Sequence, residues 1–289
     1  MPKEMVIDIL LDSLKDSALV FVFVLLIHVL LSFFEHRLAN FLSKHKKIGP
    51  LFGSLFGLIP QCGTSVMGAD LYIKKYITMG TLVAIFLSCS DEAFIAILTS
   101  GHWDKALMVL PLIGLKFAIG FGIGLLTDII FKKKEEVVEV DNVDEEETCH
   151  QHHTHNTPIH KHLVHPLIHA LEIFAYVLVI NLALGFLIGF IGEDRFASFL
   201  QTNRYLTPLF SSIIGLIPNC ASSLLLSELF IQGNLSFGAI LSGLLVNAGL
   251  GMMVLLKNRH GVKNLPWILL ICFVVSIIAG YVTCLIIGF

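Results

Sequence analysis

A heptapeptide occurs twice in this chain and divides it into two copies of one unit. Gly57-Leu58-Ile59-Pro60-Gln61-Cys62-Gly63 returns 158 residues later as Gly215-Leu216-Ile217-Pro218-Asn219-Cys220-Ala221. At this offset the copies match without a gap from about residue 50 to residue 98. In a membrane protein, repeated apolar segments that are interrupted by proline and glycine mark the place where a substrate is held.

The composition indicates a membrane protein. The chain is 55% hydrophobic and 14% charged, whereas a soluble domain carries about 25% charged residues. A helix needs about 20 apolar residues to cross about 30 Å of hydrocarbon. Six apolar runs reach this length: about 17–34, 77–98, 106–131, 167–191, 235–256 and 266–288. We therefore expect an all-α polytopic membrane protein, with no domain for nucleic acid and no disulfide framework.

Each copy also contains two shorter apolar pieces, at about 48–60 and 63–73 and at about 206–218 and 221–231. As helices of about 11–13 residues they would span about 16–20 Å, or half of the bilayer. Proline ends the first piece of each pair because it lacks a donor and clashes with the preceding turn. We expect two re-entrant hairpins of half-helices, since broken backbone at membrane depth must be buried in protein or line a cavity.

The basic residues predict how the chain threads the membrane. With both termini outside, nearly every cluster of Lys and Arg falls on the cytoplasmic side, as the positive-inside rule requires. These clusters are Arg37, Lys44, Lys46 and Lys47; Lys74 and Lys75; Lys132, Lys133 and Lys134; and Lys257, Arg259 and Lys263. Three full crossings per copy is an odd number, so the second copy starts from the opposite face and the repeats are inverted.

This threading divides the chain into three parts, which we expect to lie in the inner (cytoplasmic) membrane of a cell. Residues 1–131 form the first membrane repeat and residues 167–289 the second, inverted one. Residues 132–166 join them as a cytoplasmic linker. Each repeat would hold three full transmembrane helices and one re-entrant hairpin.

The polar residues at the two hairpin tips are the candidate substrate-binding groups. They are Gln61, Cys62, Thr64 and Ser65 in the first copy, and Asn219, Cys220, Ser222 and Ser223 in the second. Alternatively, the amides and hydroxyls satisfy backbone groups near the proline, and cysteine is a small apolar filler. Thiolate sulfur would favour soft metals or trivalent arsenic, whereas oxygen donors would favour manganese or magnesium. The tips contain both kinds of donor.

An acidic pair within an apolar run is a candidate coupling site, because charges in hydrocarbon are costly. Asp91 and Glu92 lie in the helix expected at about 77–98, and their equivalents Gly249 and Leu250 are uncharged. The pair could bind a proton or another coupling cation. Alternatively, the helix ends early and the pair is interfacial.

Four further polar residues complete the candidate ion site. Asp70 and Glu228 occupy equivalent places in the second half-helices, where they could coordinate a cation or cap the hairpins. Lys116 lies in the run at about 106–131, either as a counter-ion to the acidic pair or as a snorkelling side chain. Asn247 is the equivalent of a cysteine in the first copy.

The linker carries an acidic run followed by a cluster of metal-ligating residue types. The candidate metal ligands are Cys149, His150, His152, His153 and His155. Such tracts suit zinc, nickel or copper, although the spacing matches neither CxxC nor HExxH. The alternative is a solvated, disordered tether between the two halves.

The repeated Gly-Leu-Ile-Pro-Gln/Asn-Cys tips, the number of half-helices and the His-rich loop resemble the ten-helix heavy-metal exporter family of bacteria and archaea. Six crossings and four half-helices would make ten. The resemblance implies an exporter. We expect a secondary-active exporter of a heavy-metal cation, manganese first, coupled to protons through Asp91 or Glu92, with sodium as the other option. The transported metal would be cargo, and no resident cofactor is expected. A homo-oligomer is left open.

Two other functional classes compete with this interpretation. The chain is distantly similar to permeases that export organoarsenicals, whose tips carry Pro-x-Cys-x-Cys-Gly, but here Gly63 or Ala221 interrupts that pattern. An arsenite, organoarsenical or other oxyanion permease would use the positive ends of half-helices. We do not expect an enzyme, because the sequence has neither HExxH nor GxSxG, and it has no nucleotide-binding P-loop.

Overall fold

The computed structural model describes residues 48–59, 62–89, 93–100, 103–131, 203–218 and 220–288, with scattered positions in 10–22 and 167–182. Within these ranges the regular structure is helical, without strands. Four helical stretches of the described chain are long and apolar enough to cross a membrane: Met79–Leu98, Trp103–Phe131, Phe237–Lys257 and Gly261–Ile287. These observations agree with the predicted all-α polytopic membrane protein.

Helix pairs occupy the predicted hairpin segments in both copies. In the first copy, α2 is Gly49–Gly57 and α3 is Cys62–Ile73. In the second, α10 is Thr207–Gly215, after a short 3-10 helix η4 at Arg204–Leu206, and α11 is Cys220–Ile231. α2 and α10 each carry a proline in the first turn, where its fixed φ suits a helix start. At about 1.5 Å per residue, these helices are about 13–18 Å long, or half of a bilayer.

The spans expected as continuous helices at 77–98 and 235–256 each consist of two helices. α4 is Met79–Ser88 and is followed by α5 at Ala93–Thr99. α12 is Phe237–Val246 and is followed by α13 at Gly251–Lys257. These bounds, like those of the hairpin helices, repeat at the 158-residue offset seen in the sequence.

Local hydrogen bonding explains the break in the second copy. The Asn247 side-chain oxygen accepts from the Gly249 N–H at 2.9 Å, which offers the backbone an alternative to the helix. Gly249 then adopts a φ of +56°, a conformation that glycine tolerates at little cost. Hydropathy alone could not reveal this break, because the residues around it are apolar.

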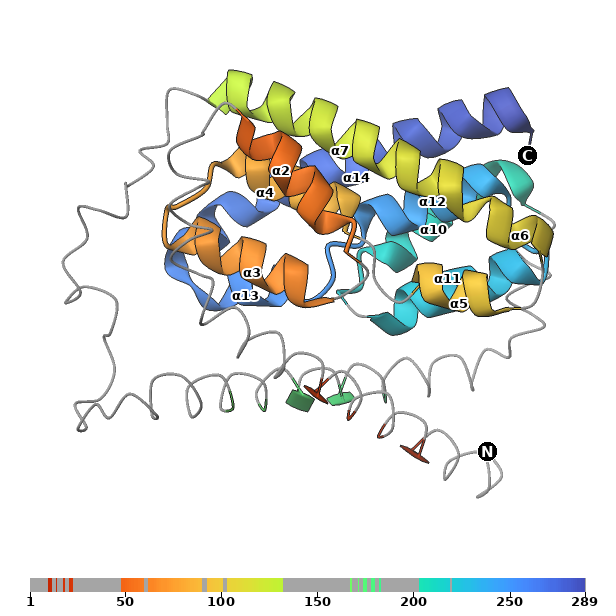
Figure 1. The fold of residues 1–289 in the computed structure, drawn as a ribbon, viewed down its shortest axis with the longest axis horizontal. Coiled ribbons are helices and arrows are strands. Elements are labelled where there is room, and N and C mark those ends of the chain that lie inside the picture. Colours follow the sequence, from red (N-terminus) through yellow and green to blue (C-terminus); the bar gives the residue numbers. More distant parts are fainter. Residues whose placement is uncertain are drawn as a thin grey trace.

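A long helix closes each copy. α7 is Val109–Phe131, preceded by the short α6 at Trp103–Leu107, and α14 is Arg259–Ile287. α4 packs against α2 and α7, and α12 packs in the same way against α10 and α14 (Figure 1). α4 and α12 are buried along their whole length, whereas α7 and α14 expose large apolar residues such as Leu110, Ile129 and Leu285, as lipid-facing helices do.

The register of these last helices shifts by two residues between the copies. Asp128 caps α4, because its carboxylate accepts from the Gly80 N–H at 2.8 Å and from the Thr78 hydroxyl at 2.9 Å. In the second copy, Cys284 takes that place and lies 3.3 Å from the Ser236 hydroxyl. The equivalent positions are therefore 156 residues apart in α7 and α14, rather than 158.

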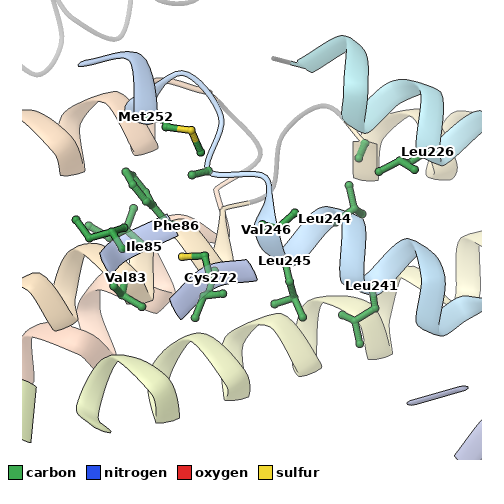
Figure 2. Close-up of a cluster of buried hydrophobic side chains, with 14 of the residues drawn as sticks. Val83, Ile85, Phe86, Leu226, Leu241, Leu244, Leu245, Val246, Met252 and Cys272 are labelled. Carbon is green, nitrogen blue, oxygen red and sulfur yellow. The ribbon is translucent and has the colours of Figure 1, made fainter. Parts of the chain in front are cut away.

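The two copies exchange partners at their second half-helices. α3 packs against α13, and α11 packs against α5, so each hairpin lies beside the broken span of the other copy (Figure 1). The apolar core is shared as well. Figure 2 shows Phe86 of α4, Leu244 of α12, Leu226 of α11 and Met252 of α13 within one buried cluster. The copies thus form one packed body.

Candidate functional site

Buried polar contacts bring the hairpin starts and the breaks in the spans together. The Ser65 hydroxyl, one turn into α3, accepts from the Gly251 N–H at the start of α13 at 3.3 Å. The Asn247 amide donates to the Ser222 hydroxyl of α11 at 3.4 Å. Both contacts fall within residues 247–251, so the starts of α3 and α11 meet the same break inside an otherwise apolar core. We call these buried polar groups the polar cluster.

The predicted hydroxyl groups are all buried, and two of them, Ser65 and Ser222, belong to this cluster. Thr64, Ser65, Ser222 and Ser223 are buried, with exposed fractions of at most 3%. The Ser222 hydroxyl also donates to the Ile217 carbonyl at 3.0 Å, before the start of α11. Ser65 and Ser222 therefore satisfy backbone groups at the breaks, as one of the two interpretations of the tips expects.

Asn247 holds the second break in shape. Its side chain is 1% exposed. The amide oxygen accepts a hydrogen bond from the Gly249 N–H, and the amide nitrogen donates one to the Ser222 hydroxyl. The predicted role of Asn247 in an ion site stays a prediction. Its contacts also give it a structural role that the sequence pattern did not identify.

Lys116 reaches the same region from α7. Its ammonium donates to the Cys89 carbonyl at 2.5 Å and to the Leu244 carbonyl at 2.6 Å, and lies 5.8 Å from the Phe94 ring centroid. The side chain is 1% exposed. The snorkelling interpretation of Lys116 is therefore wrong, since the ammonium points into the protein. Its pairing with the acidic residues after Ser90 stays a prediction.

Asp70 and Glu228 lie away from the breaks. Each is eight residues into its helix, or roughly 12 Å along the axis. Asp70 pairs with Lys74 at 2.9 Å, and exposed Glu228 accepts from the Gln232 amide at 3.1 Å. The structure does not bring these carboxylates to the polar cluster.

Several predicted residues lie outside the described part of the chain. They are Gln61, Asn219, Asp91, Glu92 and the linker residues Cys149, His150, His152, His153 and His155. Cys62 and Cys220 begin α3 and α11, but their side chains are likewise outside it. Among the described residues, no three His, Cys, Asp or Glu side chains gather closely enough to hold a metal ion. At the breaks, the described groups whose oxygens could bind a metal ion are hydroxyls, an amide and carbonyls.

Sequence reasoning missed two features that the structure supplies. Asp128 caps α4, although the rule that singled out Lys116, a lone charge in an apolar run, also applied to it. The contact between Lys116 and Leu244 joins residues 128 positions apart in different copies. No sequence signal could have found it, because it depends on the packing of α7 against α12.

Comparison with known proteins supplies one match. A protein-family model described as "Putative, 10TM heavy-metal exporter" matches residues 2–193 and residues 171–287. Together these matches cover nearly the whole chain. No curated protein and no solved structure matches it.

Proposed function

Starting from the fact that the chain belongs to the family of ten-helix heavy-metal exporters, we propose that it is a secondary-active transporter that exports a metal cation, manganese first, in exchange for protons. The observation that carries this proposal is the meeting of hairpin starts and span breaks in one buried polar cluster, made by Ser65, Ser222, Asn247 and Lys116. Discontinuous helices that meet inside the membrane are where transporters bind their substrate and coupling ions.

Inverted repeats are part of the proposal, and contacts at one end of the molecule support them. Tyr72, near the end of α3, accepts from the Asn264 amide near the start of α14 at 2.6 Å. A few residues further along the chain, the start of α4 bonds to Asp128 near the end of α7. The start of α14 and the end of α7 therefore share this end, which we call the first end.

Contacts at the opposite end of the molecule show which helix ends lie there. The Lys105 ammonium of α6, just before α7, lies 4.4 Å from the centroid of the Phe230 ring in α11. Ser236, just after α11, contacts Cys284 near the end of α14. The start of α7 and the end of α14 thus share this second end. Opposite directions of the two equivalent helices are what an inverted repeat requires.

A re-entrant first hairpin has similar support. α2 begins beside the start of α4. Gly49 lies so close to Thr81 that a Cβ added to it would collide with the Thr81 hydroxyl. Tyr72, in the last turn of α3, also lies at the first end. Both ends of this hairpin would then open to one face. The matching helix bounds of α10 and α11 favour the same arrangement, opening to the other face.

Alternating access would follow from the exchanged helix pairs. α3 and α13 run from the breaks toward the first end, and α5 and α11 run toward the second (Figure 1). We propose that these pairs part in turn while α4, α7, α12 and α14 stay packed. The substrate would then face one side of the membrane at a time.

The chemistry of the cluster favours a hard cation. Hydroxyl, amide and carbonyl oxygens suit manganese better than soft metals such as copper. Asp91 and Glu92 follow Cys89 in the chain, at the break between α4 and α5, and we propose them as the coupling site for protons, with sodium as the alternative. The linker histidines would concentrate or sense metal in the cytoplasm.

The basic residues favour an orientation in the inner membrane. Lys74, Lys257 and Lys263 lie toward the first end, whereas Lys105 and Arg204 lie toward the second. The positive-inside rule then makes the first end cytoplasmic and leaves both termini outside.

The direct test of the function is a metal-sensitivity panel of a strain that lacks this protein. We expect the deletion strain to become sensitive to manganese and to accumulate it, and plasmid-borne protein to restore both properties. Intracellular metals are quantified by mass spectrometry. A strain whose metal content is unchanged for every metal in the panel would contradict metal export.

An oxyanion permease is the second candidate, and one observation favours it. Buried Lys116 places a positive charge inside the protein, at the ends of α4 and α12. The amide ends of α3 and α11 would also attract anions. Uptake of radiolabelled arsenite or phosphate into inverted vesicles separates the candidates. Anion uptake without metal transport would favour this second function.

A further inference from the structure

The Lys116 ammonium joins the two copies at the centre of the proposed site. It donates to the Cys89 carbonyl of the first copy at 2.5 Å and to the Leu244 carbonyl of the second at 2.6 Å. The side chain is 1% exposed, so the charge is satisfied within the protein rather than by bulk water. A buried ammonium depends on such acceptors, because burying a charge without partners is very costly.

Both carbonyls belong to the inner ends of the broken spans. Cys89 is the C-cap of α4, and Leu244 lies in the last turn of α12. The last carbonyls of a helix have no partner in that helix, and they carry partial negative charge. In transporters with broken helices, such carbonyls bind the coupling cation. The ammonium therefore occupies a place built for a cation.

The second copy shows that this packing does not require an ammonium. With the two-residue register shift, the position in α14 equivalent to Lys116 is Cys272, which is also buried. A neutral side chain there packs against the same kind of broken helix (Figure 2). The charge is thus a feature of one copy only at this pair of positions, as expected of a functional group rather than of a shared scaffold.

We propose that Lys116 is an internal competitor of the transported cation, an inference that rests on the function proposed above. In the state described here, the ammonium holds the Cys89 and Leu244 carbonyls. A metal ion that enters the cluster displaces the ammonium, since two positive charges a few ångströms apart repel strongly in a low-dielectric site. Return of the ammonium helps to expel the metal. Lys116 thereby weakens metal binding and speeds release.

Equilibrium binding of Mn²⁺ to the purified full-length protein tests this competition. Lys116→Gln keeps an amide donor for the carbonyls but removes the charge, and Lys116→Met keeps the length of the side chain. We expect either folded variant to bind Mn²⁺ about tenfold more tightly or better than wild type, and to export it more slowly from vesicles. Lys116→Arg, which keeps the charge, should bind Mn²⁺ no more tightly than wild type.

Lys105→Gln is the matched control, because it removes a lysine at the second end and should leave Mn²⁺ affinity unchanged. Neutral Lys116 variants that fold but bind Mn²⁺ equally or more weakly would overturn the proposal. If the wild-type protein still binds Mn²⁺ in that case, the proposed function of metal export is not contradicted. If wild type binds no metal while arsenite binding needs the charge of Lys116, the proposed function itself fails.

Discussion

At the scale of single residues, the buried polar groups at the breaks serve the backbone and the proposed substrate together. Asn247 uses its amide to shape one break, and Ser65 binds the first turn of a helix in the other copy. Each therefore holds a backbone group at the second break, and the proposed function gives each oxygen a second role toward the transported ion. A substitution at such a residue also removes a hydrogen bond from the backbone. It should therefore change metal affinity without loss of folding only where that backbone group keeps another hydrogen-bond partner.

The tip amides provide the first prediction at this scale. Gln61→Ala and Asn219→Ala should each weaken or abolish metal export while the protein remains folded and expressed. Loss of one coordinating group typically costs about 10- to 100-fold in metal affinity. Export is measured as metal efflux from cells, with Gln232→Ala, an amide at the end of α11, as the control. Normal efflux in both tip variants would show that the tips do not bind substrate.

Asp128 provides a prediction about stability. Asp128→Ala removes two acceptors from the start of α4, and loss of such a cap costs about 1–3 kcal/mol in the free energy of unfolding. Thermal unfolding of the detergent-solubilised protein should shift clearly downward. Glu228→Ala removes an exposed acid and should leave the transition almost unchanged. Equal transitions for the two variants would contradict the capping role.

At the scale of elements, the sequence predicted the bounds of the hairpin helices closely, gave the first break only as an alternative and missed the second break. The hairpins were readable because Pro60 and Pro218 end apolar pieces too short to cross a bilayer. The break in the second span was not, because long apolar runs lie on both sides of it and the competing bond from Asn247 is local. The two-residue register shift between α7 and α14 also could not be predicted from the sequence. The two helices pack in equivalent ways, but their residues are not similar enough to align.

Movement of the α3–α13 pair provides a prediction for elements. Tyr72→Cys with Asn264→Cys, joined by a short bis-maleimide, should stop transport, because it would hold the first end closed. Each single variant treated with the reagent should remain active. Ser236→Cys joined to native Cys284 links α12 to α14 within the packed part and should leave transport intact. Full activity of the first cross-linked pair would exclude opening at that end.

At the scale of the whole molecule, two matching halves share one core and exchange their second half-helices. The sequence predicted two copies, because the ungapped match carries the same proline-ended pieces in both, and the helix bounds repeat at the same offset. It could not predict which helices of one copy pack against the other copy, because a repeat shows which segments are equivalent and not which segments are in contact. The exchanged contacts explain why neither half would hold a complete site alone.

The threading provides a prediction for the whole chain. A cysteine at Val140, in an otherwise cysteine-free protein, should resist a membrane-impermeant thiol reagent in intact cells and react after permeabilisation. A cysteine at Asn234, at the end of the second hairpin, should react in intact cells. Reaction of the linker cysteine from outside would reverse the orientation.

The central claim, proton-coupled metal export, is tested most directly in reconstituted vesicles with a pH gradient imposed across the membrane. We predict that the gradient drives Mn²⁺ movement by the wild-type protein. Asp91→Asn or Glu92→Gln should abolish the dependence on the gradient, because their carboxylates would no longer exchange protons. The account would be contradicted if wild-type vesicles moved no metal under the gradient, or if both neutral variants kept gradient-driven Mn²⁺ transport.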